Sequence, residues 1–236
     1  MTSRDRGGPP QPAPDAAAVE KLVEEIRAQL QRAGRGGRPK TADVHRIGLD
    51  FVRRMRTGGL ALAMEVADPL MRNGDIEEGM VGNQLVAAMV RHIGGNEFDR
   101  FDQWVDALTS EINTDGLASH IISRAVAGKP SLVNRLLEWT KSPSPWRRRA
   151  SVLAFSPMVR EGRFITDSFS VAEKLLNDPE ETVQRGVGML FIEASRLKAD
   201  RVFEFLEPHK GDCAKLVLST AAQKLSQAQR SALLGT

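Results

Sequence analysis

The sequence is organised around a unit that returns after about 35 residues, a spacing typical of helical-repeat solenoids. In residues 139–150, a helix end and a short turn with two prolines precede a helix that opens with a tryptophan and three arginines. In residues 177–186, a second polar turn precedes another helix with a basic residue near its start. One such unit cannot bury its apolar face alone, so the repeat predicts a stack of helices in which each pair covers the next.

The rest of the chain fits this architecture. Apolar residues follow helical spacing almost without interruption, and glycine or proline marks most of the turns between them. Because no series of alternating strands is present, we expect an all-α fold, a HEAT-like α-solenoid of antiparallel helix pairs. Asp15 is expected to cap the first helix. The expected helices are 16–33, 42–56, 59–72, 78–93, 98–112, 115–127, 130–141, 145–160, 165–177, 180–197, 200–207, 212–225 and 227–234.

The expected organisation is a disordered N-terminal tail over residues 1–15 and a single HEAT-like domain over 16–236. The tail is rich in Pro, Gly and Arg and lacks the apolar core of a signal peptide. No apolar run approaches the roughly 20 residues of a membrane span, so we expect a cytoplasmic protein, associated with the nucleoid when bound to DNA. The basic segment Gly34–Lys40 is interpreted as a solvated linker, with a DNA-contacting loop as the alternative.

Composition limits the chemistry available to the chain. Cys213 is the only cysteine, and the four histidines are scattered with no metal-ligand spacing, so neither a metal nor another cofactor is expected. The formal net charge is only +3, which permits a nucleic-acid partner without requiring one. A DNA interface must therefore depend on where the basic residues cluster.

Three segments resemble the DNA alkylation repair family, the AlkD-like HEAT-repeat DNA glycosylases, with a likeness over roughly residues 60–225. Residues 136–152 are similar to the family's tryptophan, short polar turn and Trp-x-x-Arg-Ala helix start. Residues 101–106 resemble its Trp-Trp-Asp-x-Val-Asp segment, and residues 183–190 its Gln-Lys-Ala-Ile-Gly-Trp segment. The resemblance implies a curved solenoid whose basic concave face holds duplex DNA, and an activity that removes N3- and N7-alkylated purines.

The resemblance also implies roles for individual residues. It places the catalytic carboxylate on Asp106 and an arginine that holds the damaged strand on Arg149. The positions that contact the lesion, tryptophans in active members, fall on Asp102 and Met189 in this chain. Trp104 cannot replace the first of them, because two residues along a helix turn a side chain by about 200°. A divergent member without the aromatic cradle is therefore expected.

The residue types and their spacing leave two interpretations of Asp102 and Asp106 open. An N-alkylated purine is already a good leaving group, so a carboxylate is needed mainly to stabilise the cationic sugar and to orient water. Asp106 could do this, with Asp102 one turn away on the same helix face. Alternatively, the two aspartates are a solvated face or bind arginines such as Arg100 and Arg149.

The candidate DNA-binding residues are Arg147, Arg148, Arg149, Arg185 and Lys141, with Arg124 as a further member of the basic stripe. Consecutive arginines lie 100° apart around a helix, so the three in residues 147–149 cannot share one surface. Cations at a helix N-terminus oppose its dipole, which indicates a compensating phosphate or carboxylate. Packing in the core is expected for Trp139, Trp146, Met158, Met189 and Phe191.

Three functions follow as hypotheses. The first is an alkylpurine DNA glycosylase that uses Asp106 and Arg149. The second is a DNA-binding helical-repeat protein without glycosylase activity that recognises damaged or branched DNA. The third is a protein-interaction solenoid whose groove takes a peptide or a partner helix. Double-stranded DNA is the expected partner, with a protein partner as the alternative and no membrane; strongly acidic concave walls would contradict both DNA hypotheses.

Overall fold

The computed structural model describes residues 13–235, so the tail expected over residues 1–15 lies mostly outside the described part. Within that part the protein is all-α and contains no strand, as predicted. The helices are α1 (Ala16–Ala33), α2 (Thr41–Arg54), α3 (Gly59–Arg72), α4 (Ile76–Ala87), α5 (Phe98–Val105), α6 (Glu111–Gly116), the π-helical segment η3 (Leu117–Ile122), α7 (Ser123–Gly128), α8 (Val133–Trp139), α9 (Pro145–Leu153), α10 (Ser156–Arg160), α11 (Ile165–Glu173), α12 (Glu181–Leu206), α13 (Lys215–Ala221) and α14 (Gln227–Leu234). Short 3₁₀ turns are η1 (Arg56–Gly58), η2 (Val90–His92), η4 (Pro130–Leu132), η5 (Glu207–His209) and η6 (Ala222–Lys224).

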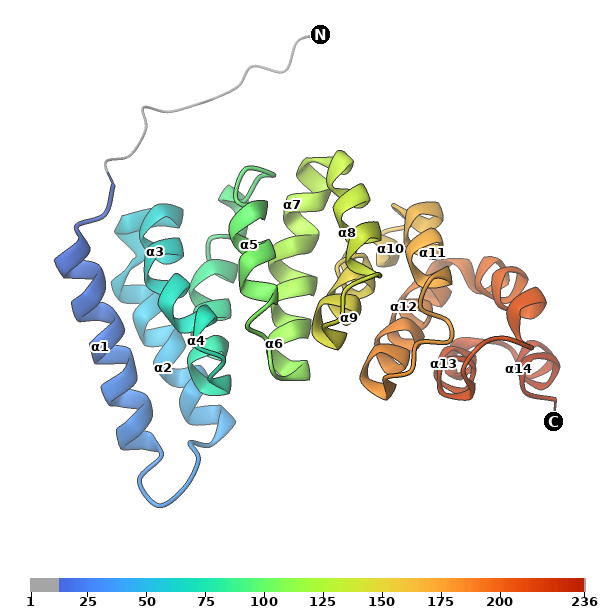
Figure 1. Cartoon of the computed structure of the whole chain (residues 1–236), viewed down its shortest axis with the longest axis horizontal. Helices are drawn as coiled ribbons and strands as arrows, with labels where there is room; N and C mark the ends of the chain where they lie inside the picture. Colours follow the sequence, from blue (N-terminus) through green and yellow to red (C-terminus); the bar gives the residue numbers. More distant parts are fainter. Residues whose placement is uncertain (1–12, 236) are drawn as a thin grey trace, which may run out of the picture.

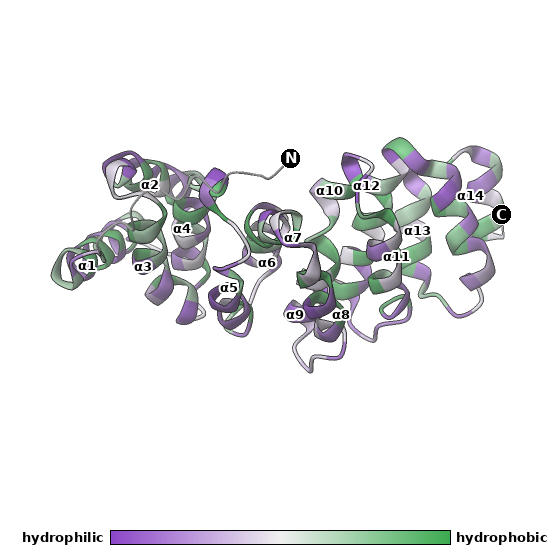
Figure 2. Ribbon diagram, turned by 90° about the horizontal axis from the view of Figure 1, so that it is seen from above, coloured by the Kyte–Doolittle hydropathy of each residue, from purple (hydrophilic) through white to green (hydrophobic). Residues whose placement is uncertain are grey.

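The helices follow one another along an elongated, curved array (Figure 1). One row contains α1, α3, α5, α8 and α11, and the other contains α2, α4, α6–α7, α9–α10 and α12. Seen from above, the side with α2, α4, α7, α10 and α12 is concave (Figure 2). Green apolar positions of both rows face each other between the rows, which is where the core lies.

The core is built from the apolar faces that the sequence predicted. A smaller cluster around Ile26 and Phe51 joins the first helices, and a larger one runs through the rest of the array. Trp104 is fully buried in the larger cluster, and its indole Nε1 donates a hydrogen bond of 2.8 Å to Asp68 Oδ1. This bond satisfies the one polar atom of the ring, so Trp104 is a core residue and is not available to a site on the surface.

Two helices, α1 and α9, begin at the residues that the sequence predicted. The Asp15 side chain accepts a hydrogen bond from Ala17 N and begins α1, as expected. Ser144 does the same for α9 with Arg147 N, and Pro145 occupies its first position. The residue before each of these helices has extended backbone angles, which fixes where the helix starts.

The expected helices around residues 98–127 were wrong in their bounds. Helix α5 ends at Val105, and Ser110 caps a new helix at Glu111 that continues through η3 to Gly128. The polar residues at the expected gap between 112 and 115 do not interrupt the helix, since Thr114 Oγ1 donates to Ser110 O and Asn113 Nδ2 donates to Ile76 O of α4. This correction moves Glu111 and Asp115 into the row of helices that lines the concave side.

Candidate functional site

The three consecutive arginines at the start of α9 point in three directions, and each binds a different carboxylate. Arg147 Nε lies 3.0 Å from Asp106 Oδ1, and Arg147 also binds the Asp102 carboxylate. Its guanidinium lies 5.1 Å from the centre of the Trp139 ring. The prediction of a compensating anion is therefore confirmed, although the arginines that bind the Asp102–Asp106 pair are Arg147 and Arg135 rather than Arg100 and Arg149.

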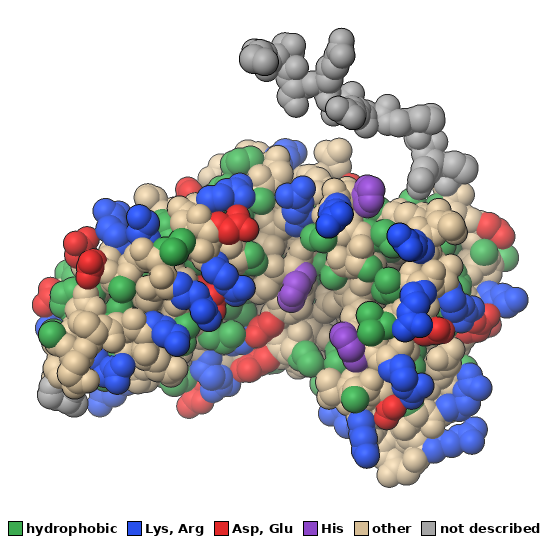
Figure 3. Space-filling view, turned by 180° about the vertical axis from the view of Figure 1, so that it is seen from behind, with side chains coloured by type: hydrophobic (Ala, Val, Ile, Leu, Met, Phe, Trp, Pro, Cys, Tyr) green, Lys and Arg blue, Asp and Glu red, His purple; other side chains and the backbone are tan. Residues whose placement is uncertain are grey.

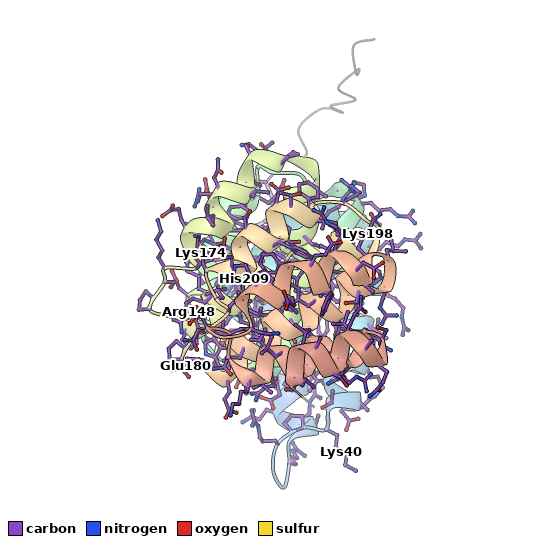
Figure 4. The ribbon with its side chains drawn as sticks, turned by 90° about the vertical axis from the view of Figure 1, so that its right-hand side faces the viewer. Lys40, Arg148, Lys174, Glu180, Lys198 and His209 are labelled. Atoms are coloured by element: carbon purple, nitrogen blue, oxygen red, sulfur yellow. The ribbon has the colours of Figure 1, made fainter. Side chains whose placement is uncertain are left out.

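Arg148 is buried and joins two turns of the repeat. Its Nε and NH2 donate to the Asp178 carboxylate at 2.6 and 3.0 Å, and its NH1 donates to Ser142 O at 2.8 Å. Asp178 is buried as well. Figure 4 shows Arg148 at the edge of the array, close to Glu180 in the second turn. Arg148 thus fastens the turn before α9 to the turn before α12, which are the two turns of the sequence repeat.

Arg149 lies at the junction of α6, α9 and α12 and is only 1% exposed. Its Nε and NH2 bind the two oxygens of Asp115 at 2.7 and 2.8 Å, a bidentate geometry. Its NH1 donates to Thr182 O, and Met189 Sδ lies 3.8 Å from NH2. Gly186 allows this close packing, because a Cβ there would lie 3.1 Å from Arg149 Cγ.

A second ion pair adjoins the first on the same side of α6. Arg185 NH2 lies 2.9 Å from Glu111 Oε1, which also accepts a hydrogen bond of 2.9 Å from Thr182 Oγ1. These contacts, above all the hydrogen bond from Arg185, lower the pKa of Glu111 from its usual value of 4.5. We call Glu111, Asp115, Arg149, Arg185 and Met189 the carboxylate site.

The lowered pKa of Glu111 makes a prediction about stability. A carboxyl group with a lower pKa in the folded state stabilises that state above its unfolded pKa, and this contribution disappears as the pH falls through the folded pKa. We therefore expect Glu111→Gln to lower the free energy of unfolding near neutral pH and to have no effect in acid below the folded pKa. Urea unfolding of both proteins at the two pH values tests this, and a loss of equal size at both would contradict it.

The structure separates residues that the sequence had grouped. Asp106, the C-cap of α5, binds Arg147 and is not in the carboxylate site. Lys141 is exposed and binds only its neighbour Glu138 among the described residues. Met189, expected in the core, is 39% exposed beside Arg149, whereas Trp139, Met158 and Phe191 are buried and Trp146 packs against the core as expected.

Glu111 and Asp115 were missed by sequence reasoning, although two signals could have found them. They are spaced i, i+4, which puts both carboxylates on one face of a helix. Asp115 also precedes Arg149 by 34 residues, close to one repeat, and residues at equivalent places of adjacent repeats lie side by side. The misplaced helix end at 112 hid both signals.

The concave side carries both signs of charge rather than an acidic wall. Figure 3 looks onto this side and shows blue basic side chains spread over it, with fewer acidic ones near the middle and histidines in the hollow. Arg91 and Arg124 are exposed and form no ion pair among residues 13–235. These cations are available to an anionic partner without breaking an internal contact.

Metal and membrane features do not add to the site within the described part of the chain. No group of three or more metal-binding side chains occurs among residues 13–235. None of the helices described there is long and apolar enough to cross a membrane.

Two rows of helices, one of which lines a concave and partly basic side, define a helical-repeat protein. The carboxylate site lies on this concave side. The model of the family described as DNA alkylation repair enzyme matches residues 24–225. The chain therefore belongs to the DNA alkylation repair enzyme family, and the match extends the likeness expected over residues 60–225 to α1. No curated protein matches the sequence significantly. Family membership gives the protein a role in DNA repair, with DNA as substrate or partner.

Proposed function

We propose that the protein binds double-stranded DNA on its concave side and hydrolyses the N-glycosidic bond of N3- and N7-alkylated purines. The observation that carries this proposal is Asp115, a carboxylate with a 31% exposed side chain that the buried Arg149 holds in bidentate contact. A carboxylate fixed in this way can stabilise positive charge on a sugar without having to reorganise.

The reaction needs little else from the protein. The alkylated purine carries a positive charge and leaves with the electron pair of the glycosidic bond, so no strong general acid is required. Water adds to the anomeric carbon and loses a proton, which yields an abasic sugar and the free base. The lowered pKa of Glu111 keeps this neighbouring carboxylate negative at neutral pH, which suits electrostatic stabilisation and not proton donation.

Asp106 remains the second candidate for the catalytic carboxylate, as the family resemblance implies. Its side chain is 66% exposed and is held by Arg147 alone among the described residues, with Asp102 one turn away. Asp115 is favoured because it shares the carboxylate site with Arg149 and with Met189, two positions to which the resemblance assigns a role.

The five basic residues proposed from the sequence divide into two groups. Arg185 and Lys141 are accessible and are proposed to contact phosphates directly. Arg147, Arg148 and Arg149 are largely or fully buried in ion pairs and are proposed to support the interface by holding α5, α6 and the repeat turns in place. Arg124, which is exposed on α7 of the concave row, is proposed as a further phosphate contact.

Binding to duplex DNA should weaken as salt increases, because phosphate contacts release counterions. We expect Arg124→Ala to reduce the slope of log affinity against log salt by about one and to weaken binding alike for all sequences. Lys21→Ala, in the exposed part of α1 on the other row of helices, is the matched control. Fluorescence anisotropy with a labelled duplex over a salt series measures both, and equal slopes for the two variants would contradict the proposed concave interface.

A specific observation favours the second function, DNA binding without glycosylase activity. Of the tryptophans, Trp104 and Trp139 are buried, and the position that the resemblance assigns to a lesion-contacting tryptophan holds Met189. Release of free N7-methylguanine from a duplex separates the two functions, since only the glycosylase produces it. A protein that neither binds DNA nor releases base would instead be a protein-interaction solenoid. In either DNA function, the protein is proposed to work in the cytoplasm, on the nucleoid.

A further inference from the structure

An apolar groove of about 620 Å³ lies beside the carboxylate site, between α2, α4 and the start of α6. Its floor and walls include Met80, Ala87 and Ile112, of which Ile112 is one of the most exposed large apolar side chains. The volume falls within the range of small-molecule sites, and too many of its lining atoms are apolar for a phosphate site. The basic residues proposed to bind DNA do not line it.

Three residues that line the groove, Asn83, Gln84 and Asn113, have buried amide oxygens without a hydrogen-bond partner, and the two asparagines are the most buried of them. Asn83 and Asn113 both line it, are more than nine-tenths buried, and have side-chain oxygens with no hydrogen-bond partner. Their amide nitrogens donate to backbone oxygens, Asn83 to Asn113 O at 3.1 Å and Asn113 to Ile76 O at 3.0 Å. Because these bonds fix which end of each amide is the oxygen, the unpartnered groups are hydrogen-bond acceptors.

The position of these amides is built into the fold. Gly79 on α4 makes room for Asn113, since a Cβ there would lie 2.4 Å from Asn113 Nδ2. Gly116 likewise makes room for Asn83, since a Cβ there would lie 3.1 Å from Asn83 Nδ2. The oxygens themselves make almost no solvent contact, so a ligand in the groove reaches them only when the side chains that cover them shift.

The aromatic rings that line the groove are imidazoles from two different elements, His45 on α2 and His120 in η3. His45 Nδ1 is in contact with the Gln84 amide, and His120 Nδ1 lies 3.2 Å from Gly116 O. These contacts orient both rings. Flat rings at the edges of an apolar groove favour a flat ligand that can stack on them.

We infer that this groove binds a nucleobase, a planar molecule with apolar faces and N–H donors at its edge. The choice of a nucleobase over other flat heterocycles rests on the proposed function. The base comes either from solution or from an unstacked position in a DNA strand, and the chemistry of recognition is the same in both cases. The groove is separate from the carboxylate site, although α6 contributes to both.

The test is isothermal titration calorimetry of the full chain with adenine, and with caffeine, a purine that has no N–H donor. We expect saturable adenine binding and at least about tenfold weaker binding of caffeine. His120→Ala should weaken adenine binding by about tenfold, within the range measured when an aromatic partner of a base is removed. His92→Ala, an exposed histidine outside the groove, should leave adenine binding unchanged. Asn83→Leu should abolish the preference for adenine over caffeine.

Absence of saturable adenine binding, or adenine binding that neither His120→Ala nor Asn83→Leu changes, would overturn the inference. The exposed position of His120 keeps the test decisive even where Asn83→Leu fails to fold. Displacement of adenine by single-stranded oligo(dA) would show that a strand presents the base, and no displacement would show that the groove takes the free base. Since the assay contains no alkylated duplex, failure of the proposed glycosylase leaves its outcome unchanged.

Discussion

Asp115→Asn is expected to slow release of alkylated base by about 100-fold, the scale on which a preorganised electrostatic contact supports a transition state. Asparagine has nearly the same shape as aspartate but carries no negative charge, so it cannot offset positive charge on the sugar. Binding of the duplex should be retained, because the substitution removes an anion from a surface that faces phosphates. Base release under single-turnover conditions, with anisotropy in parallel, separates the two effects.

Asp106→Asn is the matched control for this prediction, because it makes the same chemical change in another aspartate that pairs with an arginine of α9, in a more exposed ion pair. Asp106 binds Arg147 on α9, whereas Asp115 binds Arg149 on the same helix. We expect nearly full base release from Asp106→Asn. The reverse pattern, loss with Asp106→Asn and retention with Asp115→Asn, would assign the chemistry to the carboxylate that the family resemblance implies.

Arg149→Leu is expected to lower the free energy of unfolding by about 3–5 kcal/mol, as removal of one partner of a buried ion pair does. The substitution leaves Thr182 O and the Asp115 carboxylate without their donor at the junction of three helices. Urea unfolding followed by circular dichroism measures the change.

Arg185→Leu provides the comparison for Arg149→Leu within the same site. Its side chain is 43% exposed and binds Glu111 and Glu181, so the ion pairs are screened by solvent. The expected cost is about 1 kcal/mol or less. If the two variants lost similar amounts of unfolding free energy, the burial of Arg149 would not make its ion pair more stabilising than the exposed one of Arg185.

The sequence predicted the architecture well because helix signals are local. Helical spacing of apolar residues, the Asp15 cap and the polar turns before α9 and α12 gave the all-α repeat before any contact was known. The errors fall where tertiary contacts decide. Asn113 and Thr114 look like a turn, but hydrogen bonds to Ile76 O and Ser110 O keep them in a helix. By contrast, the two helices expected over residues 180–197 and 200–207 correspond to the two halves of α12 (Glu181–Leu206), which meet at a kink at the non-helical residue Lys198.

The site was harder to predict, because the partners of an arginine depend on how whole repeats pack. Because consecutive residues of a helix lie 100° apart, the side chains of residues 147–149 were expected to point in different directions, and they do. It could not show that Arg149 points inward to Asp115 while Arg147 holds the Asp102–Asp106 pair. The place of Met189 could not be predicted either. A methionine in an apolar helix is usually in the core, yet Met189 is partly exposed and borders the carboxylate site.

Single-turnover release of free N7-methylguanine, with the wild-type protein in excess over a duplex that carries this base, tests the central claim most directly. The account predicts first-order release whose rate saturates with protein and falls as salt weakens binding. The same duplex without the alkylated base should release nothing. Saturable, salt-dependent binding with release no faster than from the duplex alone would contradict the claim and leave a DNA-binding protein without glycosylase chemistry.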